Sequence, residues 1–216
     1  LDHLATDIEG NIDLMKADFD PKNIGIYTNA GSIGKYKFLP KAIIHGGTAI
    51  WRCYSGNRFS EDIDVYIKKD KEKINNLFNS LEKNGFQIKK KRIKENSLYS
   101  TLKFNTTTVR FEALFKNVKN LFLKEYENSE GIQITVFTLT PEELIKEKMA
   151  AYQKRKKIRD LYDIFFLLRY VKDNELIREE LVSFIRKFAV PTDEENLKTI
   201  VISGPFPTSK NMREYI

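Results

Sequence analysis

Three observations predict an α/β (α+β) fold in which a mixed sheet is flanked by helices and followed by a C-terminal helical lobe. Short apolar runs and alternating runs typical of strands occur before residue 138. A strong helix-opening signal, Thr140-Pro141-Glu142-Glu143, precedes a long helical pattern. The 216 residues suffice for one compact domain or two small lobes. We therefore expect a core at 1–138 that includes an N-terminal helix, and a lobe at 139–216 that closes the active-site cleft.

The elements of the core have local signals. An amphipathic stripe predicts a helix at 1–17, and the glycines of 20–37 predict a loop or weak strands. Thr48 is the expected N-cap of a short helix ending at Tyr54, and Asp70 caps a helix that ends before Gly85. Strands are expected at 41–45, 62–67, 86–93, 98–104, 108–115 and 133–137, with a hairpin turn at 105–107.

The C-terminal lobe is predicted to consist of helices. Thr140 is the N-cap and Pro141 the first residue of a helix that continues to about Val171. A second helix is expected over about 174–188. The tail from Gly204 contains two prolines and is expected to be irregular.

The chemistry-bearing motif is Gly46-Gly47-Thr48 followed by Asp62-Ile63-Asp64. Alternate residues of a strand share a face, so the two aspartates project together and are costly to ionise without a cation between them. Mg²⁺ is commonly held by one or two carboxylates plus nucleotide phosphates, and glycine backbone N–H groups can bind phosphate oxygens. The alternatives are a solvated strand face for the aspartates and an ordinary turn for the glycines.

With Arg58 and Ser60 between these elements, the string resembles the Gly-Gly-Thr…Arg-x-Ser-x-Asp-x-Asp signature of the AbiEii/AbiGii toxin family, a branch of the polymerase-beta-like nucleotidyltransferases. A second block, containing Lys148, Arg155 and Arg159-Asp160-Leu161-Tyr162-Asp163, resembles the downstream helix of that family. The resemblance covers roughly residues 41 to 170. It implies a polymerase-beta-like fold, a nucleotide pocket that includes Arg58 and Ser60, and functional roles for Lys148 and Asp163.

Glu112 is the candidate for a third metal-binding carboxylate. It shares a strand face with Arg110, and the superfamily places its third acid on a strand after the first pair. Metal-dependent nucleotidyl transfer generally uses such carboxylates to hold its ions. A surface Glu-Arg pair is the alternative.

The long predicted helix presents a cationic face. At 100° per residue, a sector of roughly 80° contains Lys148, Tyr152, Arg155, Arg159 and Asp163. Lysine and arginine at these positions can neutralise a triphosphate. Arg159 and Asp163 can equally form an ion pair that only stabilises the helix, worth about 0.3–0.5 kcal/mol.

Composition limits the setting of the protein. The net charge of +7 favours anionic partners, although a lysine-rich solvated surface explains it equally well. The basic run at 89–94 is either a solvated face or, if it lies near an active site, a surface that follows an RNA backbone. The single cysteine, Cys53, excludes an intrachain disulfide and fits the cytoplasm. No apolar run reaches the length needed to span a bilayer, so no membrane association is expected.

These inferences converge on a nucleotidyltransferase that uses Mg²⁺ (or Mn²⁺) and a nucleoside triphosphate. The predicted site has catalytic Asp62, Asp64, Lys148 and Asp163, and metal ligands Asp62, Asp64 and Glu112; the nucleotide-binding residues are Gly46, Gly47, Thr48, Arg58, Ser60, Arg155 and Arg159. The resemblance implies the toxin of a type IV-like toxin–antitoxin pair used in phage defence, with tRNA as acceptor and a cognate antitoxin as partner. A protein-modifying nucleotidyltransferase and a non-catalytic nucleotide- or RNA-binding module are the alternatives.

Overall fold

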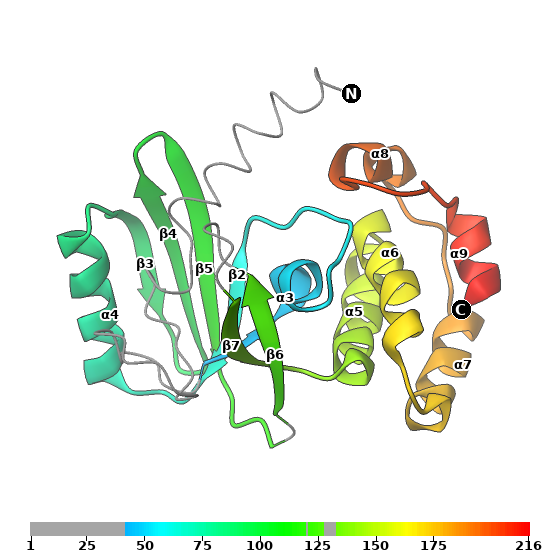
Figure 1. Cartoon of the computed structure of the whole chain (residues 1–216), viewed down its shortest axis with the longest axis horizontal. Helices are drawn as coiled ribbons and strands as arrows, with labels where there is room; N and C mark the ends of the chain where they lie inside the picture. The colour runs from blue at the N-terminus through cyan, green and yellow to red at the C-terminus, as the bar shows by residue number, and fades with distance from the viewer. Residues whose placement is uncertain (1–41, 120, 128–132) are drawn as a thin grey trace. The chain divides into compact units, whose positions relative to one another are not determined.

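The computed structural model describes residues 42–119, 121–127 and 133–216 (Figure 1). Contacts divide the chain into two compact units, which we call the sheet unit and the helical unit. The sheet unit contains the described residues 42–44 and 61–138, and the helical unit contains His45–Ser60 and Leu139–Ile216. The expected helix at 1–17 and the loop at 20–37 lie outside the described residues. The division at 138 into a core and a closing lobe stays a prediction.

The sheet unit is built on seven strands in the order β3-β4-β5-β2-β1-β7-β6. Their bounds are β1 (Ile43–His45), β2 (Ile63–Ile67), β3 (Gln87–Ile93), β4 (Ser97–Phe104), β5 (Thr107–Phe115), β6 (Phe122–Glu127) and β7 (Gln133–Thr138). The β2–β5 and β1–β7 pairs are parallel, whereas β3–β4, β4–β5 and β6–β7 are antiparallel. The predicted mixed sheet is confirmed, and β6 is a strand that the sequence pattern did not reveal.

One face of the strands β3, β4, β5 and β2 is apolar and covered by α4 (Lys71–Lys83). Leu98, Leu102 and Phe111 are buried on this face. Lys91 is level with Ser100 in the β3–β4 register, and its ammonium lies 4.1 Å from the centre of the Phe78 ring of α4. The contact shows on which side of the sheet α4 packs, and the opposite face of the four strands carries the polar residues.

Local signals at α4 and at the β4–β5 hairpin behave as the sequence predicts. The Asp70 side chain accepts a hydrogen bond from the Lys73 backbone N–H at 3.1 Å, which satisfies a donor of the first turn. Gly85 follows the helix with φ of 90°, a conformation that side chains disfavour. The hairpin turns at Asn105, whose φ is 49°; asparagine tolerates this left-handed region better than most residues.

The helical unit contains α3 (Gly46–Cys53), α5 (Pro141–Arg155), α6 (Ile158–Leu167), α7 (Arg178–Arg186), α8 (Leu197–Ile200) and α9 (Ser209–Tyr215), with short 3₁₀ turns at Leu168–Tyr170, Asn174–Leu176 and Glu194–Asn196. Figure 1 shows α5 and α6 side by side, in agreement with their contacts. Cys53 is buried, as expected for a structural thiol. None of the helices in the described part of the chain is both long and apolar enough to cross a bilayer.

The single helix expected from Thr140 to Val171 is wrong, because the chain turns at Lys156. Thr140 does cap α5, accepting from the Glu143 N–H at 3.4 Å. Lys156 then adopts φ 51° and ψ 43°, and α6 begins two residues later. The Asp193 carboxylate accepts from the Ile158 N–H at 2.8 Å and so caps α6 from a distant part of the sequence. A local helical pattern cannot reveal a break that a distant carboxylate stabilises.

Two further expectations are corrected at element ends. Thr48 does not cap α3, because the helix begins at Gly46 and Thr48 is buried inside it. The tail after Gly204 is not wholly irregular, since α9 forms there. Thr208 accepts from the Asn211 N–H at 3.1 Å, which together with the Asn211 side chain makes a capping box.

The left-handed turn at Lys156 predicts a stability effect. A non-glycine residue in this region costs roughly 1–2 kcal/mol, which glycine avoids in part at the cost of a freer unfolded chain. We expect Lys156→Gly to raise the free energy of unfolding by about 0.5–1 kcal/mol in urea titrations. Lys154→Gly, in the exposed last turn of α5, should lower it by up to about 1 kcal/mol. Destabilisation by both substitutions would show that the turn is not strained.

Candidate functional site

The predicted aspartates lie on the polar face of the sheet unit. Ile63 and Val65 are buried, while Asp62 and Asp64, which alternate with them, are half-buried. Asp62 immediately precedes β2 and Asp64 is its second residue. The alternation of the strand therefore directs the two carboxylates to one face, opposite the face that carries the apolar core.

Glu112 is next to Asp64 in the sheet. The two residues are register partners across the parallel pair β2–β5. One step along the strands, Arg110 donates from Nε to the Asp62 carboxylate at 2.8 Å, and a second guanidinium nitrogen contacts the other oxygen. Hydrogen bonding to Asp62 raises the pKa of Arg110. The polar face thus brings three carboxylates and one arginine together on adjacent strands.

This donor set suits a hard divalent cation in its chemistry. Carboxylate oxygens are preferred by Mg²⁺ and Mn²⁺, and Mg²⁺ needs only one or two protein carboxylates when substrate phosphates complete its shell. Among residues 42–119, 121–127 and 133–216, no group of three or more His, Cys, Asp or Glu side chains is arranged to hold a metal. Asp62, Asp64 and Glu112 are the residues that would supply carboxylate oxygens to such a cation.

A second cluster of predicted residues lies in the helical unit, around the start of α3. Gly46 has φ of 71°, and Gly47 is so closely covered that an added Cβ would lie 2.5 Å from the Ser60 hydroxyl and 2.6 Å from an Arg58 guanidinium nitrogen. The Thr48 hydroxyl donates to the Ser60 hydroxyl at 3.2 Å. Only glycine fits at position 47, because Arg58 and Ser60 fold back onto the first turn of the helix.

Asp163 joins three segments of the helical unit. This fully buried carboxylate on α6 accepts two hydrogen bonds from Arg58, each 2.8 Å long, and one from the Lys148 ammonium of α5 at 2.7 Å. Arg58 and Lys148 are themselves only 7% exposed. The ion pairs are therefore shielded from solvent, and removing one partner would leave an uncompensated charge in the interior.

A second buried carboxylate, Asp160, extends this cluster. Arg155 donates to its two oxygens at 2.7 Å each, and the Lys148 ammonium lies 3.8 Å from one of them. Three cations thus surround two carboxylates, so the cluster carries a net positive charge. We call Arg58, Lys148, Arg155, Asp160 and Asp163 the buried ion cluster.

The predicted common sector of one helix is wrong, because Lys148, Tyr152 and Arg155 belong to α5 whereas Arg159 and Asp163 belong to α6. Lys148 and Asp163 still meet, since the turn at Lys156 folds the two helices together. Asp163 pairs with Arg58 and Lys148, and not with Arg159 as the alternative interpretation of the helix had it.

The contact between Asp163 and Arg58 shifts the pKa of both groups. Burial by itself would raise the pKa of Asp163, but the charges of Arg58 and Lys148 and their hydrogen bonds outweigh burial, and the pKa is lowered. Burial likewise opposes the charged form of Arg58, yet the Asp163 charge and hydrogen bonds raise its pKa. Both groups remain charged at neutral pH, which is the state the geometry requires.

The sequence alone does not reveal the charged contacts of three residues, Asp160, Arg110 and His45. Asp160 lies within the motif Arg159-Asp160-Leu161-Tyr162-Asp163, but no role is predicted for it. A second acid beside several cations is a signal that could have indicated one. Arg110 was noted only as a neighbour of Glu112. The His45 ring nitrogen Nδ1 lies 3.2 Å from the Glu147 carboxylate. The two residues are far apart in sequence, so no local pattern indicates this contact.

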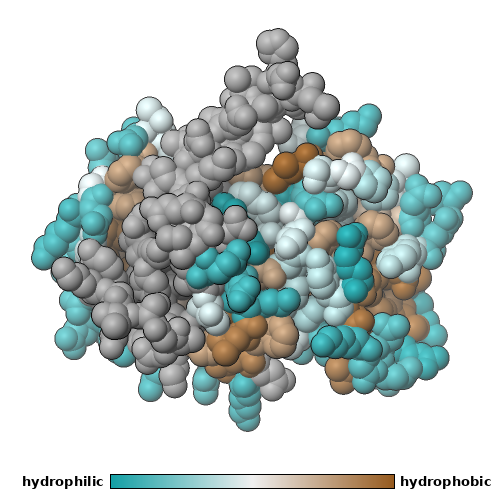
Figure 2. Space-filling model, in the orientation of Figure 1, coloured by the Kyte–Doolittle hydropathy of each residue, from teal (hydrophilic) through white to brown (hydrophobic). Residues whose placement is uncertain are grey.

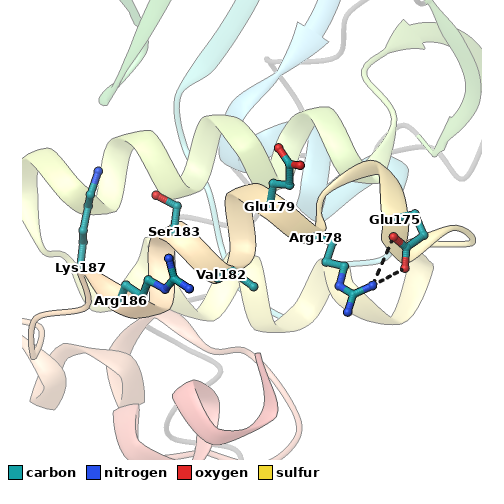
Figure 3. A pocket seen from close by; sticks show the side chains of 7 residues that line it. All are labelled: Glu175, Arg178, Glu179, Val182, Ser183, Arg186 and Lys187. Carbon is teal, nitrogen blue, oxygen red and sulfur yellow. Dashed lines mark hydrogen bonds and ion pairs between the residues drawn. The ribbon is translucent and has the colours of Figure 1, made fainter.

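A pocket of about 640 Å³ along α7 lies away from these residues (Figure 3). It is lined by Glu175, Arg178, Glu179, Val182, Ser183, Arg186 and Lys187. Arg178 is turned toward Glu175, to which it donates at 3.1 Å. Figure 2 shows mostly hydrophilic residues over α7. None of the predicted site residues lines this pocket, and its mixed charges do not single out a ligand.

The lowered pKa of Asp163 predicts a pH-dependent stability. A carboxyl group with a lowered folded-state pKa stabilises the protein fully above its ordinary pKa of 3.8, and the contribution is lost as the pH falls through the folded value. Asp163→Asn should therefore lower the free energy of unfolding at pH 7 by about 3–5 kcal/mol. The difference from wild type should shrink below about pH 4 in urea titrations.

Glu180→Gln is the matched control, because Glu180 forms an exposed pair with Lys146 at 3.0 Å. This substitution should change stability far less than Asp163→Asn does, because solvent screens an exposed pair. Equal effects of the two substitutions at pH 7 would contradict a structural role for the buried pairs.

Comparison with solved structures finds the same fold in bacterial proteins. JHP933 from Helicobacter pylori aligns over 98% of this chain and 88% of its own, with a TM-score of 0.55 and 16% identity. MenT4, a nucleotidyltransferase toxin from Mycobacterium tuberculosis, aligns over 81% of this chain and 74% of its own, with a TM-score of 0.56 and 18% identity. At these identities the likeness shows the fold. A comparison with curated protein sequences yields no match.

A family model described as "Nucleotidyl transferase AbiEii toxin, Type IV TA system" matches residues 32–202. The match includes the polar face of the sheet unit and the buried ion cluster of the helical unit. The seven-stranded mixed sheet agrees with the fold of the nucleotidyltransferase neighbours. The chain therefore belongs to the AbiEii nucleotidyltransferase toxin family and is a nucleotidyltransferase enzyme.

Proposed function

We propose that the protein transfers a nucleoside monophosphate from a nucleoside triphosphate to a hydroxyl group of an acceptor, with Mg²⁺ or Mn²⁺ as cofactor. The observation that carries the proposal is the alignment of Asp64 with Glu112 in register, with Asp62 on the same face. In the reaction, the acceptor oxygen bonds to the α-phosphorus and the bond to the β-phosphate bridging oxygen breaks. Pyrophosphate leaves, and the acceptor hydroxyl proton passes to solvent or a nearby base.

The carboxylates of the polar face serve to hold the cation and the reacting end of the acceptor. Bound there, the cation would lower the pKa of the attacking hydroxyl and stabilise the charge of the leaving group. Asp64 and Glu112 supply oxygens from adjacent strands. Asp62 supplies a third when Arg110 gives up one of its two contacts, and Arg110 keeps a positive charge beside the carboxylates in either arrangement.

The helical unit supplies groups suited to a triphosphate. The first backbone N–H groups of a helix are unpaired and bind phosphate oxygens, which gives Gly46, Gly47 and Thr48 their role at the start of α3. The Ser60 hydroxyl lies against this turn. The net positive charge of the buried ion cluster favours an anion nearby, and Asp163 fixes the position of the Lys148 ammonium and the Arg58 guanidinium.

Arg155 and Arg159 are proposed as outer phosphate-binding residues. The Arg155 side chain is 44% accessible, and its guanidinium is held by the Asp160 carboxylate. Arg159 is half-buried and is the second residue of α6. Both residues carry planar groups that bind phosphate through paired hydrogen bonds.

The proposed acceptor is tRNA, and the proposed partner is a cognate antitoxin. A net charge of +7 favours a polyanion over a neutral or acidic protein. Membership of a type IV toxin–antitoxin family supports an antitoxin that suppresses the effect of the enzyme on growth. Phage defence and a cytoplasmic location remain proposals on the same ground.

Removing either aspartate should abolish catalysis without unfolding the protein. Asp62→Asn and Asp64→Asn each remove a negative metal ligand from a half-buried position but leave the side-chain volume almost unchanged. We expect pyrophosphate release to fall by at least about 100-fold, because several kcal/mol of transition-state stabilisation are lost. Glu61→Gln, at the exposed neighbouring position, should retain wild-type activity. More than a tenth of wild-type activity in either aspartate variant would refute the assignment.

Toxicity should require this chemistry. An enzyme that depletes a shared acceptor is harmful even at low expression, so induction of the wild-type chain should arrest growth of a bacterial host. Induction of Asp64→Ala at the same protein level should not, and growth rate measured against an empty vector checks both. If Asp64→Ala is as toxic as wild type, binding or aggregation causes the harm and the proposed role is wrong.

A further inference from the structure

The polar face of the sheet unit continues from the acidic strands to the edge strand β3. In the row of register partners that begins at Asp64, Glu112 is followed by Tyr99 on β4 and Arg92 on β3. The neighbouring row runs from Arg110 through Thr101 to Lys90. One face therefore carries carboxylates on the inner strands and cations on the outer strand.

The side chains of β3 divide between the two faces. Lys91 points to α4, where its ammonium lies 3.3 Å from the Asn75 side-chain oxygen and over the Phe78 ring. Lys90 and Arg92, on either side of it, belong to the opposite face and are exposed. The Lys90 ammonium lies 5.2 Å from the centre of the Tyr99 ring, which confirms its side. The basic residues of β3 are all exposed, but alternate ones belong to opposite faces of the sheet.

The spacing between carboxylates and cations matches a nucleic-acid strand. Neighbouring strands are about 4.8 Å apart, so Arg92 is roughly 14 Å from Asp64 across the sheet. A stacked nucleic-acid strand advances by about 3.4 Å per phosphate along its axis. A stacked polynucleotide with its reacting hydroxyl at the aspartates would therefore bring a phosphate to β3 about four nucleotides away. Two exposed cations at the edge of the sheet favour such a polyanion.

We propose that Lys90 and Arg92 bind the phosphates of a single-stranded RNA end whose reacting hydroxyl lies at Asp62 and Asp64. A cation–π contact with the Tyr99 ring keeps the Lys90 ammonium on this face. The inference rests on the proposed function, because the aspartates define where the strand ends. It adds to that function a second, non-reacting subsite that selects an acceptor by length and charge.

The test compares two double charge reversals that change net charge equally. Lys90→Glu/Arg92→Glu alters the proposed subsite. Lys71→Glu/Lys83→Glu alters exposed positions of α4, on the other side of the sheet. Binding of fluorescein-labelled single-stranded RNA of mixed sequence, about 2 to 12 nucleotides long, is measured by fluorescence anisotropy at several salt concentrations.

For the longest RNA, the β3 double variant should bind at least about tenfold more weakly than wild type, and the slope of log affinity against log salt should fall by about 1.4 for two lost phosphate contacts. The α4 double variant should bind like wild type. For RNA of about two nucleotides the β3 variant should not differ from wild type, because such a strand does not reach β3. Lys90→Arg/Arg92→Lys should bind normally, which separates loss of charge from misfolding.

Equal weakening by both reversals, or a β3 effect that does not depend on RNA length, would overturn the proposal. Transfer of the nucleoside monophosphate to protein and not to RNA would also overturn it. Asp64→Asn separates the two claims, since it should lose transfer but keep RNA binding. Transfer to RNA without a specific β3 effect refutes the subsite alone. If the β3 double variant loses RNA binding in a length-dependent way but the wild-type protein transfers no nucleotide, the proposed function is refuted instead.

Discussion

The helical unit depends on one buried carboxylate. Asp163 holds Arg58 from the segment after α3 and Lys148 from α5, so three segments meet at two oxygens. Each cation is costly to bury alone, and the carboxylate makes their burial possible. Arg58, which this contact holds in place, lies against Gly47 together with Ser60. A side chain at position 47 would collide with both. The sequence Gly-Gly-Thr, the arginine and the downstream Lys…Asp block are therefore parts of one packed arrangement.

The sheet unit uses the opposite principle, because its charged residues stay partly accessible. Alternation along β2 and β5 buries Ile63, Val65 and Phe111 while leaving Asp64 and Glu112 on the polar face. Half-exposed carboxylates on neighbouring strands repel one another unless a cation is shared. Arg110 provides a positive charge of this kind beside Asp62. A face of this kind can exchange partners during a reaction, whereas the buried ion cluster cannot do so without a large loss of stability.

Much of the fold was predictable because its signals are local. The Asp70 cap, the hairpin at Asn105 and the Thr140 start of α5 depend on residues within a few positions of each other. The break at Lys156 was not predictable, because Asp193 caps α6 from another part of the chain. The sequence singles out Arg58, Lys148, Arg155 and Asp163, but it gives no sign that Asp160 joins them or which residues pair. Helical periodicity allows a pair of Arg159 with Asp163, whereas Asp163 binds Arg58 and Lys148. The catalytic, metal-binding and nucleotide-binding roles of the chosen residues stay predictions.

Nucleotidyl transfer is tested most directly by following the two ends of the triphosphate. The protein is incubated with Mg²⁺, total cellular RNA or protein, and each nucleoside triphosphate labelled at either the α- or the γ-phosphate. The account predicts that α-label enters the RNA pool and that γ-label is released as pyrophosphate in equal amount. Incorporation of γ-label into either pool would show phosphoryl transfer in place of nucleotidyl transfer. Release of label without incorporation would show simple hydrolysis, and both results would contradict the account.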